Sequence, residues 1–316
     1  MIDRYGRNID YLRLSITERC TLKCEYCRSD EGLCPKKAEL SKHDFTRIVK
    51  AMASLGIRKI RLTGGEPLLR KDVVEMITEF SAISGIEEIV MTTNAQQLKG
   101  MAKKLKDAGL SRLNISIDSL NEQKYRNITR GGDLKAVLSG IEEAIEAELL
   151  PIKLNAVIMR GRNDDEIDDF IALTKDKPIN MRFIELMPIG KLGTDPSLRV
   201  PSEELIAARP YLKPVRPMYD SQPSADYRID GYIGSVGFIS PVSNKFCGKC
   251  NRVRVMSDGI LKQCLGDNSE VSLKNALSGT DEQLKKAIRQ AIFDKPKQHN
   301  FDKGFSSQRQ MNAIGG

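Results

Sequence analysis

The stretch that decides the fold runs from residue 57 to 92 and reads IRKIRLTGGEPLLRKDVVEMITEFSAISGIEEIVMT. It opens with a β-branched run, Ile57–Thr63, and continues with a helical pattern at Asp72–Ala82. Gly85 follows the helical pattern, at the place of a C-terminal cap, and a second β-branched run, Ile86–Thr92, ends the stretch. A strand, a helix and a strand in this order predict parallel strands joined by a helical crossover.

The same alternation continues on both sides of this stretch, up to about Glu185. Further strands are predicted at Leu12–Thr17, Arg112–Asp118, Ile152–Ile158 and Ile179–Glu185. Further helices are predicted at Ser41–Leu55, Ala95–Ala108 and Asp133–Ala147, with Ser41 and Asp133 as N-caps. Six such units could form an open barrel or a doubly wound sheet, and periodicity alone does not choose between them.

The pattern changes after about Met187, where prolines interrupt the chain repeatedly up to Pro223. Later in the chain we expect a hairpin at Tyr227–Ile239, a strand at Arg252–Met256, and helices at Val271–Leu277 and Asp281–Phe293. The change predicts two domains, residues 1–188 and a smaller unit at 189–316. The polar tail beyond Pro296 is typical of a disordered terminus.

Composition bounds the class of protein. The 316 residues include 50 Lys plus Arg against 42 Asp plus Glu, a formal charge of +8, with 40% hydrophobic and 29% charged residues. These values are typical of a soluble globular chain of about two domains. We expect a cytoplasmic protein without a membrane partner, because there is no long apolar run and no signal-peptide core. The modest charge and the 5% aromatic content predict no nucleic-acid partner.

Cysteines are the most informative residue type, since the chain has seven of them and only two His, His43 and His299. Six fall into two groups of three: Cys20, Cys24 and Cys27, then Cys247, Cys250 and Cys264. Thiolates at such spacing can converge on a soft metal centre. A closed zinc site needs four ligands, whereas three thiolates on a four-iron cluster leave one iron open. Buried core thiols for the first group and zinc for the second are the alternatives, and Cys34 is interpreted as a bystander.

Two motifs carry a family resemblance. Cys20-Thr-Leu-Lys-Cys24-Glu-Tyr-Cys27 matches the CxxxCxxC signature of the radical S-adenosylmethionine (SAM) enzymes, and Gly64-Gly65-Glu66-Pro67 resembles their GGEP motif. One departure is Arg28-Ser29, directly after Cys27, where the family often has Met-Pro.

The resemblance extends along nearly the whole chain to one branch of that family, the GTP 3′,8-cyclases (MoaA) that open molybdenum-cofactor biosynthesis. The similar segments are Leu12–Ser15, Thr92–Asn94, Leu113–Asp118, Arg182–Met187, the second cysteine group and the terminal Gly315-Gly316.

The resemblance implies an α/β fold, a partial (β/α)6 TIM-like barrel whose open side is closed by a smaller C-terminal α+β domain. It implies two 4Fe–4S clusters at opposite ends of the lumen, the first binding SAM and the second the guanine of GTP. Reductive cleavage of SAM would give a 5′-deoxyadenosyl radical that takes hydrogen from the 3′-carbon of the GTP ribose. Attack on carbon 8 would then give 3′,8-cyclo-7,8-dihydro-GTP.

The resemblance also assigns residues. The SAM positions are Tyr26, Gly65, Ser116 and Met187. The GTP positions are Arg13, Arg61, Thr92, Lys153, Arg252, Val253 and Arg254, with Arg252, Arg254 and the first three cysteines as catalytic residues and Arg182 as a weaker candidate. The Gly-Gly tail would enter the active site, where glycines fit and side chains would clash. Implied partners are an electron donor, the next pathway enzyme (cyclic pyranopterin monophosphate synthase) and a second copy in a homodimer.

Two other functions compete with this one. A radical SAM enzyme with an auxiliary cluster could act on a peptide, although such enzymes usually carry more C-terminal cysteines. A nucleic-acid-binding zinc protein would explain the charge and the CxxC spacing, but no basic stripe interleaved with aromatic residues is present.

Overall fold

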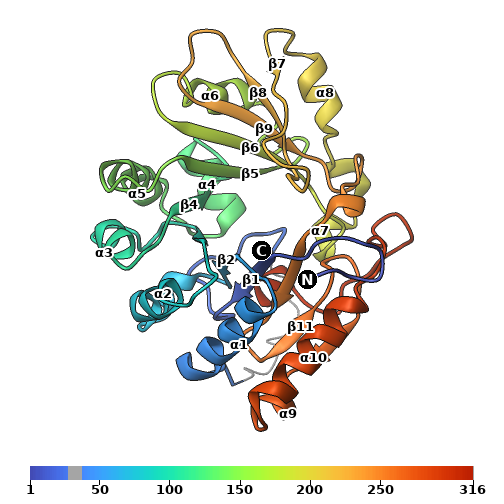
Figure 1. Cartoon of the computed structure of the whole chain (residues 1–316). Coiled ribbons are helices and arrows are strands. Elements are labelled where there is room, and N and C mark those ends of the chain that lie inside the picture. The colour runs from blue at the N-terminus through green and yellow to red at the C-terminus, as the bar shows by residue number, and fades with distance from the viewer. Residues whose placement is uncertain (28–37, 316) are drawn as a thin grey trace.

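The computed structural model describes residues 1–27 and 38–315, in which the strands form one sheet (Figure 1). In chain order the strands are β1 (Tyr11–Ser15), β2 (Lys59–Thr63), β3 (Glu88–Thr93), β4 (Arg112–Ser116), β5 (Ile152–Ile158), β6 (Ile179–Glu185), β7 (Lys213–Pro214), β8 (Ala225–Arg228), β9 (Ser235–Ile239), β10 (Arg252–Val255), β11 (Ile260–Lys262) and β12 (Glu270–Ser272). Their spatial order is β12-β11-β10-β1-β2-β3-β4-β5-β6-β9-β8-β7. The six predicted strands lie side by side and parallel as β1 to β6.

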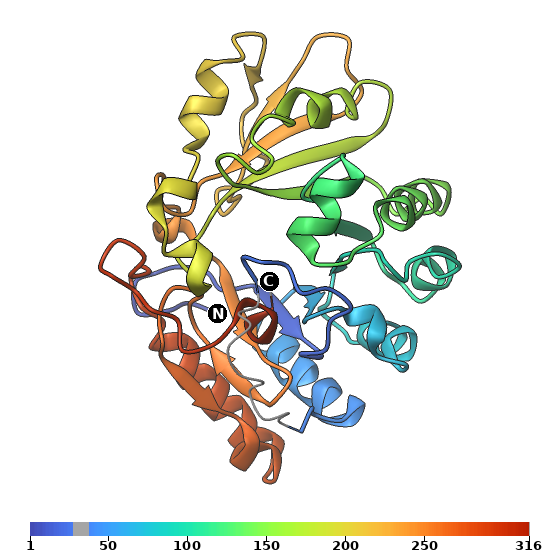
Figure 2. The same cartoon turned by 180° about the vertical axis from the view of Figure 1, so that it is seen from behind.

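Helices connect these strands and cover one face of the sheet. They are α1 (Lys42–Ser54), α2 (Val73–Ser81), α3 (Ala102–Asp107), α4 (Glu122–Thr129), α5 (Leu134–Glu146), α6 (Ile167–Ala172), α7 (Gly190–Gly193), α8 (Ser202–Ala207), α9 (Lys274–Leu277), α10 (Asp281–Phe293) and α11 (Met311–Ile314), with short 3₁₀ turns η1 (Pro67–Leu69), η2 (Pro196–Leu198) and η3 (Cys247–Lys249). Figures 1 and 2 show α1, α2, α3 and α5 as an outer layer around the strands. The predicted caps are confirmed, because Ser41 forms a capping box and the Asp133 side chain accepts from two backbone N–H groups.

Side chains alternate along each strand between the helix layer and the lumen. The apolar ones, such as Leu12, Leu14 and Ile60, are fully buried against the helices and form the main core. The polar ones between them, such as Arg13 and Arg61, line the opposite face. A barrel filled by branched apolar side chains has a solid centre. This sheet instead encloses a cavity that charged side chains such as Arg13 and Arg61 line, and such a cavity is suited to a ligand.

Residues 189–316 extend the same sheet at both edges. Strand β10 pairs in parallel with β1, and β9 pairs in parallel with β6. On its other side β10 pairs with antiparallel β11, and β9 pairs with antiparallel β8. The predicted hairpin at Tyr227–Ile239 is confirmed as β8 and β9, and the predicted strand at Arg252–Met256 as β10. The strand pairing itself was not predicted, because it joins distant residues: Ser235 lies beside Asn180, and Arg252 lies beside Tyr11, 241 positions away.

Two predicted helices were wrong in their extent. The helix expected at Ala95–Ala108 begins only at Ala102, since Ala95 has φ +58° and the side chain of Thr93 accepts from its N–H, which holds a turn. The helix expected at Val271–Leu277 forms only in its last four residues. Glu270–Ser272 pairs with β11, and the helical turn α9 starts at Lys274. In both cases a local bond or a strand partner overrides helical periodicity.

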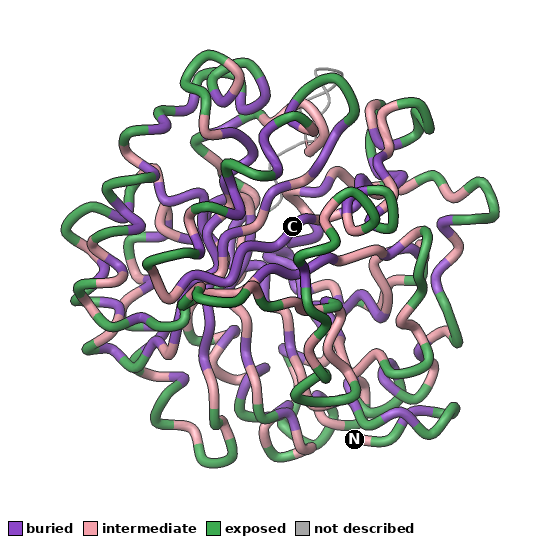
Figure 3. The backbone as a smooth tube through the Cα atoms, turned by 90° about the horizontal axis from the view of Figure 1, so that it is seen from above, coloured by how far each residue is buried: buried purple, intermediate pink, exposed green. Residues whose placement is uncertain are grey.

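The C-terminal tail is ordered through Gly315, contrary to the ordinary expectation for a polar terminus. It ends in the buried turn α11, and Figure 3 shows this end of the chain surrounded by buried segments. Across the described part of the chain, no helix is both long and apolar enough to cross a membrane.

Candidate active site

One cavity of about 340 Å³ occupies the lumen of the partial barrel. Its wall combines residues from β1 to β6 with residues of the C-terminal segment, and both cysteine groups line it. Buried oxygen atoms of five lining residues have no hydrogen-bond partner: Thr63, Asn155, Glu185, Gln263 and Asn312. Buried polar atoms are normally bonded, so these oxygens indicate a cavity shaped for a polar ligand.

The first cysteine group lies on the loop after β1, held against the GGEP turn. Gly65 N–H donates to the Thr17 carbonyl at 2.8 Å, and Glu66 N–H donates to the Arg19 carbonyl at 2.7 Å. A Cβ on Gly65 would lie 2.3 Å from that Arg19 carbonyl oxygen. Glycine is therefore required here for the two loops to approach each other, and the GGEP motif positions the cysteine loop.

Glu66 fastens this turn to the next strand end. Its carboxylate is fully buried and accepts from Thr93 Oγ1 at 2.7 Å and from the N–H groups of Asn94 and Leu68. Burial raises its pKa to about 7, although these donors lower it. The Asn94 side chain in turn donates to Thr21 Oγ1 and lies 3.6 Å from Cys20 Sγ. The loops after β1, β2 and β3 thus form one bonded unit around the first group.

Tyr26 is anchored from the opposite side of the cavity. Its hydroxyl donates to Asp118 Oδ2 at 2.7 Å, while Asp118 Oδ1 accepts from Val157 N–H at 2.9 Å. Burial raises the pKa of Tyr26 well above its ordinary value, and the neighbouring Asp118 carboxylate raises it further. The Tyr26 hydroxyl therefore stays protonated, and its hydrogen bond to Asp118 fixes the ring in the cavity wall beside Cys24 and Cys27.

The second cysteine group surrounds the other end of the cavity. Cys247 begins η3, Cys250 immediately follows it, and Cys264 lies after β11. His299 also lines this end, but both ring nitrogens are occupied: Nε2 bonds to the Pro241 carbonyl at 2.8 Å and Nδ1 accepts from Phe301 N–H. This leaves His299 no nitrogen to complete a fourth ligand position.

Both groups fit iron–sulfur clusters. None of the six described cysteines forms a disulfide, and all six are partly buried on the cavity wall. Among residues 1–27 and 38–315, no three His, Cys, Asp or Glu side chains converge on a single metal ion. A cubane does not require such convergence, because each thiolate binds its own iron. Soft thiolate donors, three to a group, are the ligand set that suits such a cluster.

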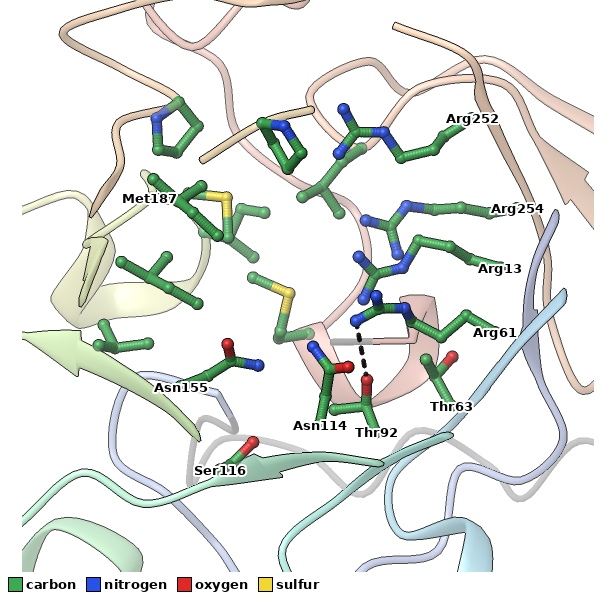
Figure 4. A pocket seen from close by; sticks show the side chains of 18 of the residues that line it. Arg13, Arg61, Thr63, Thr92, Asn114, Ser116, Asn155, Met187, Arg252 and Arg254 are labelled. Atoms are coloured by element: carbon green, nitrogen blue, oxygen red, sulfur yellow. Dashed lines mark hydrogen bonds between the residues drawn. The ribbon is translucent and has the colours of Figure 1, made fainter. Parts of the chain in front are cut away.

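A row of arginines crosses one wall between the two groups. Arg13 is in register with Arg254 on one side and with Arg61 on the other, so the three side chains emerge on the same face. Figure 4 shows them and Arg252 stacked along the wall and pointing inward. Burial lowers the pKa of Arg13 well below its usual range, and repulsion from Arg254 and Arg61 lowers it further. Burial likewise lowers the pKa of Arg254 to about 10.

More cations face this row across the cavity. Lys153 and Arg182 come from β5 and β6 and line the same space. Burial, together with repulsion from Arg182 and Arg112, lowers the pKa of Lys153 to about 6. Burial lowers the pKa of Arg182 to about 10. Buried cations that repel one another mark a site for a polyanion, whose charge would remove the repulsion.

The structure brings nearly all of the predicted site residues to this one cavity. The residues on its wall are Arg13, Tyr26, Arg61, Gly65, Thr92, Ser116, Lys153, Arg182, Met187, Arg252, Arg254 and the six grouped cysteines. Val253 is the exception: its side chain belongs to the apolar core on the helix side, and only its backbone borders the arginine row. Cys34, Arg28, Ser29 and Gly316 lie outside the described residues.

Some cavity residues were not singled out from the sequence. Asp118, Asn114 and Asn155 belong to strand motifs, but nothing in the sequence separated their roles from core packing. The alternation along β4 and β5 could have found Asn114 and Asn155, since they share a face with Ser116 and Lys153. Lys295 carries no sequence signal at all.

The tail enters the cavity beside the arginine row. Arg254 donates to the carbonyls of Ile314 at 2.9 Å and Gly315 at 3.0 Å, and Arg13 donates to Gly315 at 3.2 Å. Met311 N–H donates to the Cys27 carbonyl. The tail therefore links the first cysteine loop to the arginines, as its resemblance to the family predicts.

Gly315→Ala is expected to displace the tail. Gly315 has φ +76°, and a Cβ there would lie 2.5 Å from Thr63 Oγ1. The left-handed backbone alone costs about 1–2 kcal/mol for alanine, so product formation should fall by about tenfold or more. Quantification of SAM cleavage and cyclic product, side by side, checks this: cleavage should persist while product falls. Adding Thr63→Ala removes the clashing oxygen and should restore part of the product; no recovery would place the cause elsewhere.

The fold and the two cysteine groups are those of radical SAM enzymes. Residues 14–174 match the family model of the radical SAM superfamily, and residues 179–301 match that of Molybdenum Cofactor Synthesis C. The chain is 50% identical over 322 residues to the GTP 3′,8-cyclase of Alkaliphilus oremlandii, with 100% of both chains covered. It is 44% identical over 323 residues to the GTP 3′,8-cyclase of Moorella thermoacetica, again over 100% of both. The chain therefore belongs to the GTP 3′,8-cyclase family, which confirms the resemblance.

Solved structures confirm the fold. The crystal structure of Streptococcus suis SuiB superposes with a TM-score of 0.64 at 15% identity, over 95% of this chain and 69% of that one. The SAM-bound form of SuiB superposes with a TM-score of 0.60 at 12% identity, over 98% of this chain and 70% of that one. At this identity the likeness concerns the fold alone, and it supports the predicted partial barrel.

Proposed function

We propose that this chain is a GTP 3′,8-cyclase. It cleaves SAM reductively and cyclises GTP to 3′,8-cyclo-7,8-dihydro-GTP, the first step of molybdenum-cofactor biosynthesis. One observation carries the proposal: two three-cysteine groups and an inward row of arginines share a single cavity. The arrangement supports a redox cofactor at each end and a triphosphate between them.

The chain's residues divide these tasks. Cys20, Cys24 and Cys27, within residues 1–188, would hold one 4Fe–4S cluster, and the three cysteines within 189–316 would hold the other. When bound, a 4Fe–4S cluster with an open iron supplies the electron for reductive SAM cleavage. The chain supplies the binding site, with Gly65, Ser116, Met187 and the fixed ring of Tyr26 beside SAM. The tail and the helix layer keep water from the reacting atoms.

The cations position the substrate. Arg13, Arg61, Arg252 and Arg254 offer guanidinium groups suited to phosphate oxygens. Thr92 accepts from Arg61 at 3.3 Å and keeps that guanidinium oriented into the cavity. Lys153 adds a point charge from the facing strand. Val253 would act through its backbone only.

A peptide substrate fits the cavity less well. The tail already occupies part of the lumen, and about 340 Å³ suits a small molecule. Residues 189–316 contain three cysteines, fewer than a fuller auxiliary set would need. We further propose that a separate electron donor reduces the enzyme, that cyclic pyranopterin monophosphate synthase takes the product, and that the enzyme can form a homodimer.

The test of the proposed function combines metal analysis with product identification. Anaerobically purified protein should hold about eight irons per chain, as two 4Fe–4S clusters require. Incubation of the reduced protein with SAM and GTP should give 5′-deoxyadenosine and a cyclised nucleotide with the mass of GTP, identified by mass spectrometry. One or two equivalents of zinc per chain in place of iron would contradict the proposal.

GTP binding is expected to take up a proton at Lys153. Its pKa of about 6 leaves the amine mostly neutral at pH 7, and a bound triphosphate raises that pKa. Uptake should approach about one proton per GTP near pH 8 and vanish below about pH 5, where the amine is already charged. Calorimetry in buffers of different ionisation enthalpy measures it. Lys153→Met should abolish the uptake, while exposed Lys135→Met should not; equal uptake in both variants would contradict the assignment.

A further inference from the structure

Lys295 is a buried cation at the second-cysteine end of the cavity. It lies two residues after the end of α10, is 2% exposed, and lines the cavity wall. Its Nζ donates to the carbonyl of Gln263, the residue before Cys264, at 2.5 Å. No carboxylate of the described residues forms an ion pair with it. A buried ammonium without an acidic partner is costly unless another negative group balances it.

Lys295 and the three cysteines of the second group line the same cavity, and its bond to the Gln263 carbonyl places it next to the residue before Cys264. The pKa of Cys250 is raised by burial, but Lys295 and Arg252 reverse this and leave it lowered. Burial also raises the pKa of Cys264, and Lys295 opposes that rise. The buried ammonium of Lys295 is thus fixed, by its bond to Gln263, at the end of the cavity where the second cysteine group lies.

Arg7 is a second cation near the second cysteine group, and unlike Lys295 it has an acidic partner. It donates to the carbonyls of Cys247, Pro296 and Lys297, so it braces the same loops. Its guanidinium is paired with buried Asp3 at 2.6 Å, which neutralises it. Lys295 has no such acid, so its positive charge remains available to whatever the cysteines hold.

We propose that Lys295 is the charge partner of the second cluster. Its ammonium balances the negative charge of the three thiolates, and it favours the reduced cluster, which carries one more electron. Lys295 is a positioning residue, since it acts through Cys250 and Cys264 and the Gln263 carbonyl. This inference rests on the proposed function, because it requires a cluster at these cysteines.

The experiment isolates the second cluster in a full-length chain with Cys20, Cys24 and Cys27 changed to Ala. In this background Lys295→Met removes the buried charge, Lys295→Arg keeps it, and Lys297→Met removes an exposed charge two residues away. Redox titration followed by electron paramagnetic resonance measures the one-electron reduction. We expect Lys295→Met to lower the reduction equilibrium constant by about tenfold, which is about 59 mV for one electron. Lys295→Arg and Lys297→Met should stay near the parent value.

Iron content and iron-free melting decide the remaining outcomes. Loss of iron in Lys295→Met but not in Lys295→Arg would support a requirement of the cluster for positive charge at residue 295. Loss of iron in both variants would mean that the side chain of Lys295 acts through packing, and this would overturn the proposal. An unchanged potential in Lys295→Met would also overturn it. The iron-free Lys295→Met chain should melt no lower than its parent, since it buries no unpaired charge. A parent without iron would refute the second cluster itself, and with it the proposed function.

Discussion

Cys24→Ala is expected to abolish 5′-deoxyadenosine formation from SAM. Cys24 is one of three thiols on the loop that the GGEP turn holds in place, and it is partly buried on the cavity wall. Burial raises its pKa well above the ordinary value, so in the iron-free chain Cys24 is a neutral thiol. Alanine removes a cluster ligand, and iron content should fall by about four per chain. Chromatography of the nucleoside products with iron analysis measures both.

Two matched variants serve as controls for Cys24→Ala. Cys250→Ala removes a thiol from the other end of the cavity, so it should lose a similar amount of iron but still cleave SAM, without forming cyclic product. Cys34→Ala should change neither, since Cys34 is interpreted as a bystander. Retained SAM cleavage in Cys24→Ala would refute the assignment of the first group.

Arg254→Ala is expected to weaken GTP binding far more than SAM binding. Arg254 lies beside Arg13 in the arginine row and is 8% exposed. A hydrogen bond to a charged group contributes about 1.5–3 kcal/mol, so GTP affinity should fall by about 10- to 100-fold. Equilibrium dialysis with each ligand separately measures the two affinities. An equal loss of both would mean that Arg254 supports structure rather than substrate.

The tail contacts of Arg254 make a second arm necessary. Because the guanidinium also holds the Ile314 and Gly315 carbonyls, its removal could act through a displaced tail. A chain that ends at Ala313 separates the two effects. If Arg254→Ala weakens GTP binding further in the shortened chain, the arginine contacts substrate itself; if it has no effect there, it acts through the tail. Arg254→Lys should recover charge but not the paired geometry of a guanidinium.

Sequence reasoning went furthest where a signal is local. The spacing of Cys20, Cys24 and Cys27, the alternation of strand and helix, and the caps at Ser41 and Asp133 depend on residues close together in the chain. It failed where a distant partner or a single bond decides, as at Glu270–Ser272, which pairs with β11, and at Ala95, where a side-chain bond holds a turn. Spacing alone left open whether both cysteine groups hold iron–sulfur clusters. The family resemblance predicted that they do, at opposite ends of one lumen.

By itself the sequence determined the class of fold, the two sets of soft ligands and the position of every arginine along the chain. Only the tertiary structure decided that β10 lies in register beside β1, which sets Arg254 next to Arg13 across 241 residues of sequence. It also decided that the tail turns inward to these arginines, and that Lys295 meets the second cysteine group. The physical reason is common to all three. Strand register and the burial of charge are properties of the whole packed chain, and no short stretch of sequence encodes which distant residue will supply the partner.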